Sequence, residues 1–314
     1  MSYLQDLTLR LSAGAGSLSE SLRERQTRWI LAQQKPDGGF AGREGESDPY
    51  YTGFALRALM VLDGLTEESA DSAAKYLQSR LDKQETIIDL ISIVYGAAVL
   101  QLVAGIDVLG TADPRWPDRL ADLLESMRRD DGGYAKSAEG RAGSTYQTFL
   151  TVLCYELIDR SVPNPQQAVD FLLRHEHEEG GFLEIRVGKR AGVNPTAAAI
   201  GALKTLGALT PEIRDRTVEF LADMQSDEGG FTANTRIPMA DLLSSCTGMI
   251  TLTDLEATDR INRRRVCHYA QQMERPEGGF AGFAMDPSQD VEYTFYGLAT
   301  LALASDPSEL GESL

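Results

Sequence analysis

The sequence contains few of the residues that build covalent or metal-centred frameworks. Its 314 residues include only three cysteines and three histidines. Cys154, Cys246 and Cys267 are widely separated, which argues against a disulfide scaffold and a cysteine-only zinc site. So few cysteines fit a reducing compartment, and we expect a cytoplasmic protein.

The sequence also lacks net positive charge. It has 30 lysines and arginines against 47 aspartates and glutamates, which gives a formal net charge of −17. Proteins that bind nucleic acid collect phosphates with a basic field, and anionic lipid surfaces attract cations in the same way. The composition therefore argues against nucleic acid and anionic lipid as partners.

One long uncharged stretch, residues 90–106, has to be weighed as a membrane span. A spanning helix needs about 20 apolar residues, and this stretch has 17, including Ser92 and Gln101. The N-terminus lacks the basic and apolar regions of a signal peptide. We expect no membrane span, and interpret residues 90–106 as a buried helix of a globular fold.

A short phrase with two glycines recurs along the chain at regular spacing. Its copies are KPDGGF (35–40), RDDGGY (129–134), HEEGGF (177–182), SDEGGF (226–231) and RPEGGF (275–280). Their first glycines are separated by 94, 48, 49 and 49 residues, and 94 is twice 47. One copy near residue 85 has therefore lost its phrase, and the chain contains six units.

Each unit has the pattern of two helices joined by a loop. An amphipathic helix precedes the phrase, with apolar residues three apart, such as Val218, Leu221 and Met224. The glycine pair ends this helix because glycine adopts the left-handed conformation, and the aromatic residue after it fills the corner. A more apolar helix follows the loop. The pattern predicts an exposed outer helix and a buried inner helix in every unit.

Six helical hairpins can form an open solenoid or a closed ring. An open solenoid needs polar end units, whereas the first and last units here are as apolar as the others. We therefore expect an all-α fold, an (α/α)6 toroid in a single domain spanning residues 1–314, with a central apolar funnel. The predicted units are 20–65, 66–110, 116–160, 165–209, 212–257 and 261–305.

The residues before each glycine pair resemble those of a known repeat. An aromatic residue, Ile or Leu, Gln and Gly-Gly-Phe follow one another between Trp29 and Phe40, and again between Phe220 and Phe231. This phrase resembles the repeat of protein prenyltransferase β subunits and of squalene and oxidosqualene cyclases, over about residues 20–305. The resemblance implies a toroid that holds an isoprenoid, such as a polyprenyl diphosphate, and a helical partner subunit. Fold alone does not grant activity.

The resemblance also implies where a zinc site would lie. Protein prenyltransferases hold zinc with an Asp-x-Cys pair at the start of one inner helix and a histidine at the start of the next. Asp241 matches the aspartate, but Leu243 takes the cysteine position and Tyr293 the histidine position. Cys246 lies about one helical turn past Leu243. We expect no zinc cofactor, with Asp241 and Cys246 as weak metal candidates; magnesium is compatible with a diphosphate substrate.

Four basic residues match the region in which the family binds diphosphate. Arg190 takes the position of a family histidine, Arg186 and Lys189 lie close by, and Arg236 follows SDEGGF, the phrase of the fifth unit. Guanidinium groups suit phosphate oxygens because they donate two parallel hydrogen bonds. We predict that these four residues bind substrate. The alternative is a solvated basic loop paired with nearby glutamates.

The cyclase branch of the family places an acidic phrase at the start of an inner helix. There a protonated carboxylic acid protonates an alkene. The segment Asp290-Val291-Glu292-Tyr293-Thr294 matches this phrase in part, and Glu292 is the better candidate for the acid. Asp290, Asp241 and Tyr293 complete the predicted catalytic set. The alternative for Asp290, as for Asp48, is a helix cap.

Tyrosines at the starts of inner helices, Tyr51 and Tyr146, are predicted to contact substrate, and their π faces can stabilise a carbocation. Core packing is the alternative.

Three functions stay open. The first is a prenyltransferase-like protein that binds a long isoprenoid and transfers or rearranges it without zinc. The second is a single-domain class II terpene cyclase with Glu292 as acid. The third is a non-catalytic scaffold for a lipid or a peptide.

Overall fold

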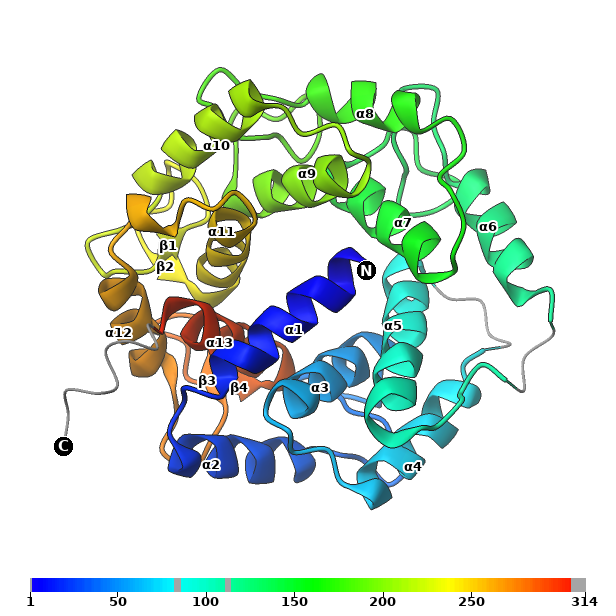
Figure 1. The fold of residues 1–314 in the computed structure, drawn as a ribbon, viewed down its shortest axis with the longest axis vertical. Coiled ribbons are helices and arrows are strands. Elements are labelled where there is room, and N and C mark those ends of the chain that lie inside the picture. Colours follow the sequence, from blue (N-terminus) through cyan, green and yellow to red (C-terminus); the bar gives the residue numbers. More distant parts are fainter. Residues whose placement is uncertain (1, 82–85, 111–113, 306–314) are drawn as a thin grey trace.

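Two concentric layers of helices form a closed ring in the computed structural model, which describes residues 2–81, 86–110 and 114–305 (Figure 1). The outer layer comprises α2 (Glu20–Leu31), α4 (Glu67–Gln78), α6 (Trp116–Ser126), α8 (Pro165–Leu173), α10 (Pro211–Asp223) and α12 (Arg263–Met273). The inner layer comprises α3 (Pro49–Val61), α5 (Ile87–Ala104), α7 (Thr145–Leu157), α9 (Val193–Thr205), α11 (Leu242–Asp254) and α13 (Val291–Ala304). The predicted all-α toroid is confirmed.

The ring closes because the last unit packs against the first. Each inner helix contacts the next in chain order, and α13 contacts α3. Polar contacts reinforce this seam: the Gly279 backbone N–H donates to Oε1 of Gln26 at 2.7 Å, and Nε of Arg43 pairs with Oδ2 of Asp290 at 2.9 Å. No polar capping unit is therefore needed.

The aromatic residue of each phrase joins its loop to the inner helix. Phe40 is fully buried, and its backbone N–H donates to Oγ1 of Thr52 at 2.9 Å. The same contact recurs between Tyr134 and Thr148, Phe182 and Thr196, Phe231 and Ser245, and Phe280 and Thr294. The predicted position of the aromatic side chain in the corner is confirmed, and it fixes where each inner helix begins.

The first glycine of the phrase allows a close contact between neighbouring units, as seen at Gly38. Its φ of +90° is a conformation that L residues rarely adopt. A Cβ atom built there would lie 2.0 Å from the backbone oxygen of Ser72 in α4. Gly38 therefore lets the next outer helix approach the loop closely. The prediction that the glycine pair ends the outer helix is wrong, because α2 ends at Leu31 with Ala32 as its cap, and Gly38 instead closes a tight turn in the loop by donating its backbone N–H to the oxygen of Lys35.

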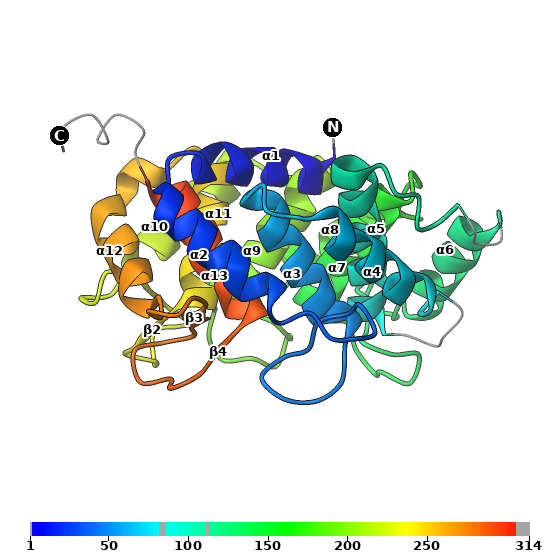
Figure 2. The same cartoon turned by 90° about the horizontal axis from the view of Figure 1, so that it is seen from below.

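The two faces of the ring differ. The loops that precede the inner helices lie on one face, and they include the short antiparallel pairs β1 (Phe231–Thr232) with β2 (Ala240–Asp241) and β3 (Phe280–Ala281) with β4 (Gln289–Asp290) (Figure 2). We call this side the loop face. The helix α1 (Tyr3–Ala15) lies across the opposite face (Figure 2), and the 3-10 helix η1 (Thr258–Arg260) links α11 to α12.

The long uncharged stretch forms the inner helix α5. By length and composition alone α5 could cross a membrane, but half of it is buried within the ring. It packs between α3, α4 and α7, as expected for a buried helix of this fold. In the unit 66–110 the place of the missing glycine phrase, near residue 85, lies outside the described residues, whereas its two helices, α4 and α5, are described.

Candidate functional site

A cavity of about 530 Å³ occupies the centre of the ring. Its walls come from all six inner helices and from α1, and most of the lining side chains are apolar or aromatic. Pockets for small molecules usually measure about 300–1,000 Å³ and combine apolar walls with a few polar groups. The cavity has the size and lining of such a pocket.

The cavity is closed on one side and reaches solvent on the other. Leu4, Leu7 and Leu11 of α1 line it and are themselves buried, because α1 crosses the centre of the ring (Figure 1). At the other end Tyr146, the second residue of α7, lines the cavity and is 37% exposed. The cavity therefore opens toward the loop face.

A buried carboxylate holds α1 in place. Asp254, at the end of α11, accepts hydrogen bonds from the Tyr3 hydroxyl at 2.8 Å and from Nη2 of Arg10 at 2.7 Å. Nζ of Lys204 lies 2.8 Å from the same carboxylate. Two cations and a hydroxyl thus compensate one buried charge and tie α1 to the inner ring.

Glu292 is the predicted catalytic carboxylate that lines the cavity. It is the second residue of α13, and its Oε1 accepts hydrogen bonds from the Tyr50 hydroxyl at 2.6 Å and the Tyr296 hydroxyl at 3.0 Å. The first turn of α3 and the second turn of α13 supply these donors. Two helices from opposite ends of the chain therefore orient one carboxyl group toward the central space.

The surroundings of Glu292 favour its neutral form. Burial raises the pKa of Glu292 above its ordinary value, although the hydrogen bonds from Tyr50 and Tyr296 lower it in part. General-acid catalysis requires a protonated carboxyl group, and a raised pKa favours the protonated form. The two hydroxyls would also stabilise the carboxylate that remains after a proton is donated.

The cavity contains a cation that the sequence pattern did not single out. Arg57 lines the cavity from α3, and its guanidinium carbon lies 4.0 Å from the ring centroid of Phe54 and 4.8 Å from that of Phe295. The available signal was compositional, because Arg57 is the one charged residue in the apolar α3 sequence. Arg57 covers one face of Phe54 and one face of Phe295, so these two faces are not available to stabilise a carbocation.

Asp290 and Asp48 both cap inner helices. Oδ1 of Asp290 accepts from the Tyr293 backbone N–H at 2.8 Å, and Oδ1 of Asp48 accepts from the Tyr50 backbone N–H at 2.7 Å. Asp290 also pairs with Arg43. These contacts support the capping alternative, and a catalytic role for Asp290 stays a prediction.

The residues at the zinc position of the family differ from its ligands, and the absence of a zinc cofactor stays a prediction. Both carboxylate oxygens of Asp241 are engaged by Ser244, one by its backbone N–H at 2.7 Å and one by its hydroxyl at 2.9 Å. Burial raises the pKa of the Cys246 thiol to about 12, so it is protonated at neutral pH. Tyr293 offers a phenol where the family has an imidazole. Among the described residues, no three histidine, cysteine or acidic side chains gather where they could hold a metal ion.

The four predicted diphosphate ligands lie in two neighbouring loops of the loop face. Arg186, Lys189, Arg190 and Arg236 are all exposed. Nη1 of Arg190 donates to Oγ1 of Thr235 at 2.8 Å, which joins the loop before α9 to the loop before α11. Within the described ranges none of the four lines the cavity. We call this set of four cations, in the loops before α9 and α11, the basic rim.

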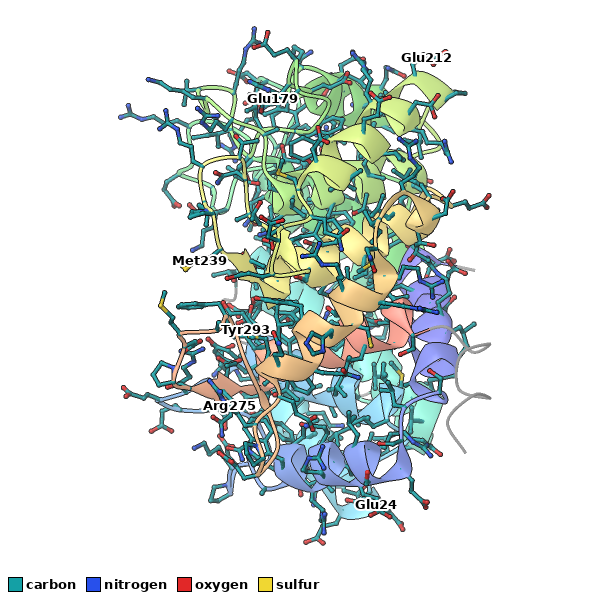
Figure 3. All side chains as sticks on the ribbon, turned by 90° about the vertical axis from the view of Figure 1, so that its left-hand side faces the viewer. Glu24, Glu179, Glu212, Met239, Arg275 and Tyr293 are labelled. Atoms are coloured by element: carbon teal, nitrogen blue, oxygen red, sulfur yellow. The ribbon has the colours of Figure 1, made fainter. Side chains whose placement is uncertain are left out.

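Apolar side chains share this part of the loop face. Val187 is 83% exposed, and Ile237 and Met239 are also exposed. Figure 3 shows Met239 at the left-hand edge, on the loop face, and Tyr293, in the first turn of α13, lower and farther from that edge. An apolar ligand that approaches the cavity from this face would thus meet both basic and apolar groups.

The two predicted substrate-binding tyrosines occupy different places. Tyr146 lines the cavity, and burial raises its pKa to about 12, so the phenol is neutral. Tyr51 packs beside the cavity wall, with its ring centroid 5.2 Å from that of Tyr50. Tyr50 itself lines the cavity. The structure therefore brings Glu292, Tyr50 and Tyr146 together at the cavity, and Tyr51 packs against Tyr50 outside the lining.

Solved structures of similar shape include two that bind isoprenoids. Candida albicans protein geranylgeranyltransferase-I, complexed with GGPP, matches with a TM-score of 0.73 and 14% identity over 90% of this chain and 91% of that one. A variant of the type II terpene cyclase MstE from Scytonema, in complex with geranylgeranyl dihydroxybenzoate, matches with a TM-score of 0.61 and 11% identity over 96% and 97%.

The same fold also occurs in an enzyme that is named for a different kind of substrate. The GH76A alpha-1,6-mannanase from Salegentibacter sp. HEL1_6 matches with a TM-score of 0.60 and 14% identity over 96% of this chain and 99% of that one. At these identities the likeness shows the fold alone. No curated protein matches the chain by sequence.

A family model matches most of the chain. The model of the prenyltransferase alpha-alpha toroid domain covers residues 69–197 and 197–312. These segments include five of the six inner helices, whose residues supply most of the cavity wall. The resemblance drawn from the glycine phrases is confirmed, and the chain belongs to the prenyltransferase alpha-alpha toroid domain family.

Proposed function

We propose that this protein binds a long-chain isoprenoid in its central cavity, as a polyprenyl diphosphate, and transfers or rearranges the chain without the usual zinc. The observation that carries the proposal is the apolar cavity itself, which is closed by α1 and opens toward the loop face. An isoprene chain would replace water against these walls, and burial of apolar surface is worth about 25 cal/mol per Å². Neighbours of the same fold hold GGPP and a geranylgeranyl compound.

In this proposal the basic rim receives the diphosphate. Arg186, Lys189, Arg190 and Arg236 supply four positive charges in a chain of net charge −17. Charge-assisted hydrogen bonds from guanidinium groups to phosphate oxygens are among the strong polar contacts. The chain would lie in the cavity and the diphosphate at its mouth.

Calorimetric titration with geranylgeranyl diphosphate tests this proposal. Replacement of both Arg190 and Arg236 by Ala should weaken binding tenfold or more. A matched control removes two arginines outside the basic rim, the exposed Arg160 and the partly exposed Arg214, and should leave the affinity unchanged. Unchanged affinity in the rim variant would remove the diphosphate from the proposal. A lack of binding by the wild type would favour a scaffold for another ligand.

A second candidate function is that of a class II terpene cyclase, and the position of Glu292 favours it. The protonated carboxyl group would transfer its proton to a terminal alkene carbon, with formation of a C–H bond and of a tertiary carbocation on the neighbouring carbon. The internal double bonds would then close rings until a proton is lost. Tyr50 and Tyr296 would stabilise the carboxylate left behind.

Product analysis tests the cyclase candidate. The protein is incubated with squalene and with geranylgeranyl diphosphate, and cyclic products are sought by mass spectrometry. Glu292→Gln should abolish any cyclisation because an amide cannot donate the proton, whereas the exposed Glu44→Gln should not. Cyclisation that persists in Glu292→Gln would rule out Glu292 as the acid.

A further inference from the structure

We infer that Arg57 forms an anion-binding subsite inside the cavity, and that the ligands of this protein include apolar chains that end in a carboxylate. The inference rests on chain binding in the proposed function, but it does not depend on the basic rim. It assigns a role to a residue that lies neither in the repeat phrase nor at any position matched to the family's zinc or diphosphate ligands.

The position of Arg57 within the cavity is unusual for an arginine. It sits two turns into α3, among the aromatic rings that line the central space. Its Nε donates to the backbone oxygen of Gly53 at 2.9 Å, and its guanidinium carbon lies 5.4 Å from the ring centroid of Tyr95. Together with Phe54 and Phe295, three rings surround this cation.

Arg57 has no ionic partner among residues 2–81, 86–110 and 114–305. Its Nε hydrogen bond is internal to α3, and neither terminal nitrogen has a hydrogen-bond acceptor in the described chain. A guanidinium removed from bulk water is costly unless an anion or acceptors compensate it. Contacts with aromatic rings recover part of this cost. The two free N–H edges are the part of the site that a ligand would complete.

The carboxyl groups of the cavity do not fill this role. Glu292 is hydrogen-bonded by two tyrosines and forms no ion pair with Arg57. Glu184 is an exposed residue at the mouth. The positive charge of Arg57 lowers the pKa of Glu292 in part, but the two side chains form no ion pair, so the terminal nitrogens of Arg57 stay open to a ligand.

The geometry of one guanidinium suits one carboxylate. A planar fork donates two parallel hydrogen bonds to the two oxygens of a carboxylate. A diphosphate carries several negative charges and suits a group of cations, such as the rim. The subsite at Arg57 therefore selects chains with a single acidic group that can enter the cavity, and the rim selects a head group that stays outside.

The test compares three probes of equal chain length by calorimetric titration: geranylgeranoic acid, geranylgeraniol and geranylgeranyl diphosphate. The wild type should bind the acid at least about tenfold more tightly than the alcohol, as expected for charge-assisted hydrogen bonds away from water. Arg57→Met keeps the apolar stem and its contact with the rings but removes the charge, and should abolish this preference. Arg190→Met, on the rim, should retain it.

Several outcomes would overturn the inference. If the wild type binds the acid and the alcohol equally, the anion subsite at Arg57 is overturned, whereas the proposal that the cavity binds the chain still holds. The inference is also overturned if Arg57→Met still prefers the acid over the alcohol. It is overturned as well if Arg190→Met, and not Arg57→Met, loses this preference. If neither the acid nor the alcohol binds, chain binding itself fails and the inference fails with it. Arg57→Lys, should Arg57→Met not fold, should keep part of the preference because it keeps the charge without the fork.

Discussion

The hydroxyl of Tyr50 donates a 2.6 Å hydrogen bond to Oε1 of Glu292, and so joins the first inner helix to the last. The two residues are 242 positions apart in the sequence. The contact lies at the point where the ring closes, and it also holds the one predicted catalytic carboxylate that lines the cavity. Ring closure and orientation of Glu292 are therefore coupled.

Removal of this hydrogen bond should change the acidity of Glu292. Tyr50→Phe deletes a donor that favours the ionised carboxylate, so we expect the pKa of Glu292 to rise further. The fold should lose about 1 kcal/mol, the usual net contribution of one hydrogen bond. Titration of the ¹³C-labelled glutamate carboxyl groups by NMR measures the shift. Tyr51→Phe is the matched control and should leave Glu292 unchanged, since Tyr51 donates no hydrogen bond to it.

The stability of the fold should depend on pH through Glu292. Its pKa in the folded state lies above the ordinary value of about 4.5, so the folded state binds the proton more tightly than the unfolded state. The resulting contribution is complete below pH 4.5 and is lost as pH rises through the folded pKa. Glu292→Gln should remove this dependence, so that its free energy of unfolding falls less between pH 4.5 and 8.

Denaturant unfolding at several pH values measures this difference. The exposed Glu44→Gln serves as the control and should follow the wild type. An identical pH profile for Glu292→Gln and the wild type would contradict a raised pKa for this carboxyl group.

The attachment of α1 should depend on the charge of Asp254. Asp254→Asn keeps the shape of the side chain but leaves Arg10 and Lys204 without their buried carboxylate. We expect a loss of about 2 kcal/mol, less than for a fully buried pair, because both cations are partly exposed. Residues 3–15 should also become more susceptible to limited proteolysis.

An exposed ion pair provides the comparison for Asp254. Asp215 pairs with Arg214 at 2.8 Å, and its side chain is 69% exposed. Asp215→Asn should change the stability by less than about 1 kcal/mol and should not alter cleavage of α1. Unchanged protection of α1 in Asp254→Asn would show that its leucines alone hold it.

Backbone strain and close packing at Gly38 can be separated by comparison with Gly45, which lies in the loop after the phrase. Gly38→Ala combines an unfavourable φ with a clash against the backbone of Ser72, and should destabilise the fold by more than about 2 kcal/mol. Gly45 has a φ of +97°, but a Cβ there meets nothing within 4 Å. Gly45→Ala should cost about 1 kcal/mol, from backbone strain alone. Equal losses in thermal or denaturant unfolding would exclude the close approach as a factor.

The repeat was predictable because its signals are local. A glycine with positive φ followed by an aromatic residue, as at Gly38 and Phe40, turns the chain between two helices, and the Phe40 backbone N–H then attaches the loop to Thr52 in the first turn of the next helix. The spacing of these phrases then sets the number of units. The order of the helices and the toroid followed from spacing and composition alone.

The contacts that build the site were not predictable in the same way. Arg43 and Asp290, or Tyr3 and Asp254, are joined only after the ring has closed, and no spacing rule connects residues that far apart. Arg57 carried a weak signal, a lone charge in an apolar helix, but the sequence does not show that its partners are aromatic rings. The helix α1 stands outside the repeat, so periodicity did not place it across the cavity.

The position of α1 limits the order in which molecules can meet inside the ring. In the described part of the chain α1 covers the side of the cavity opposite the loop face, so a ligand that enters between the loops would leave by the same route. A second reactant would therefore arrive behind the first, and would meet whichever end of the bound chain was admitted last. If the protein binds an isoprenoid as proposed, this geometry would favour loading of the chain first and of any acceptor second.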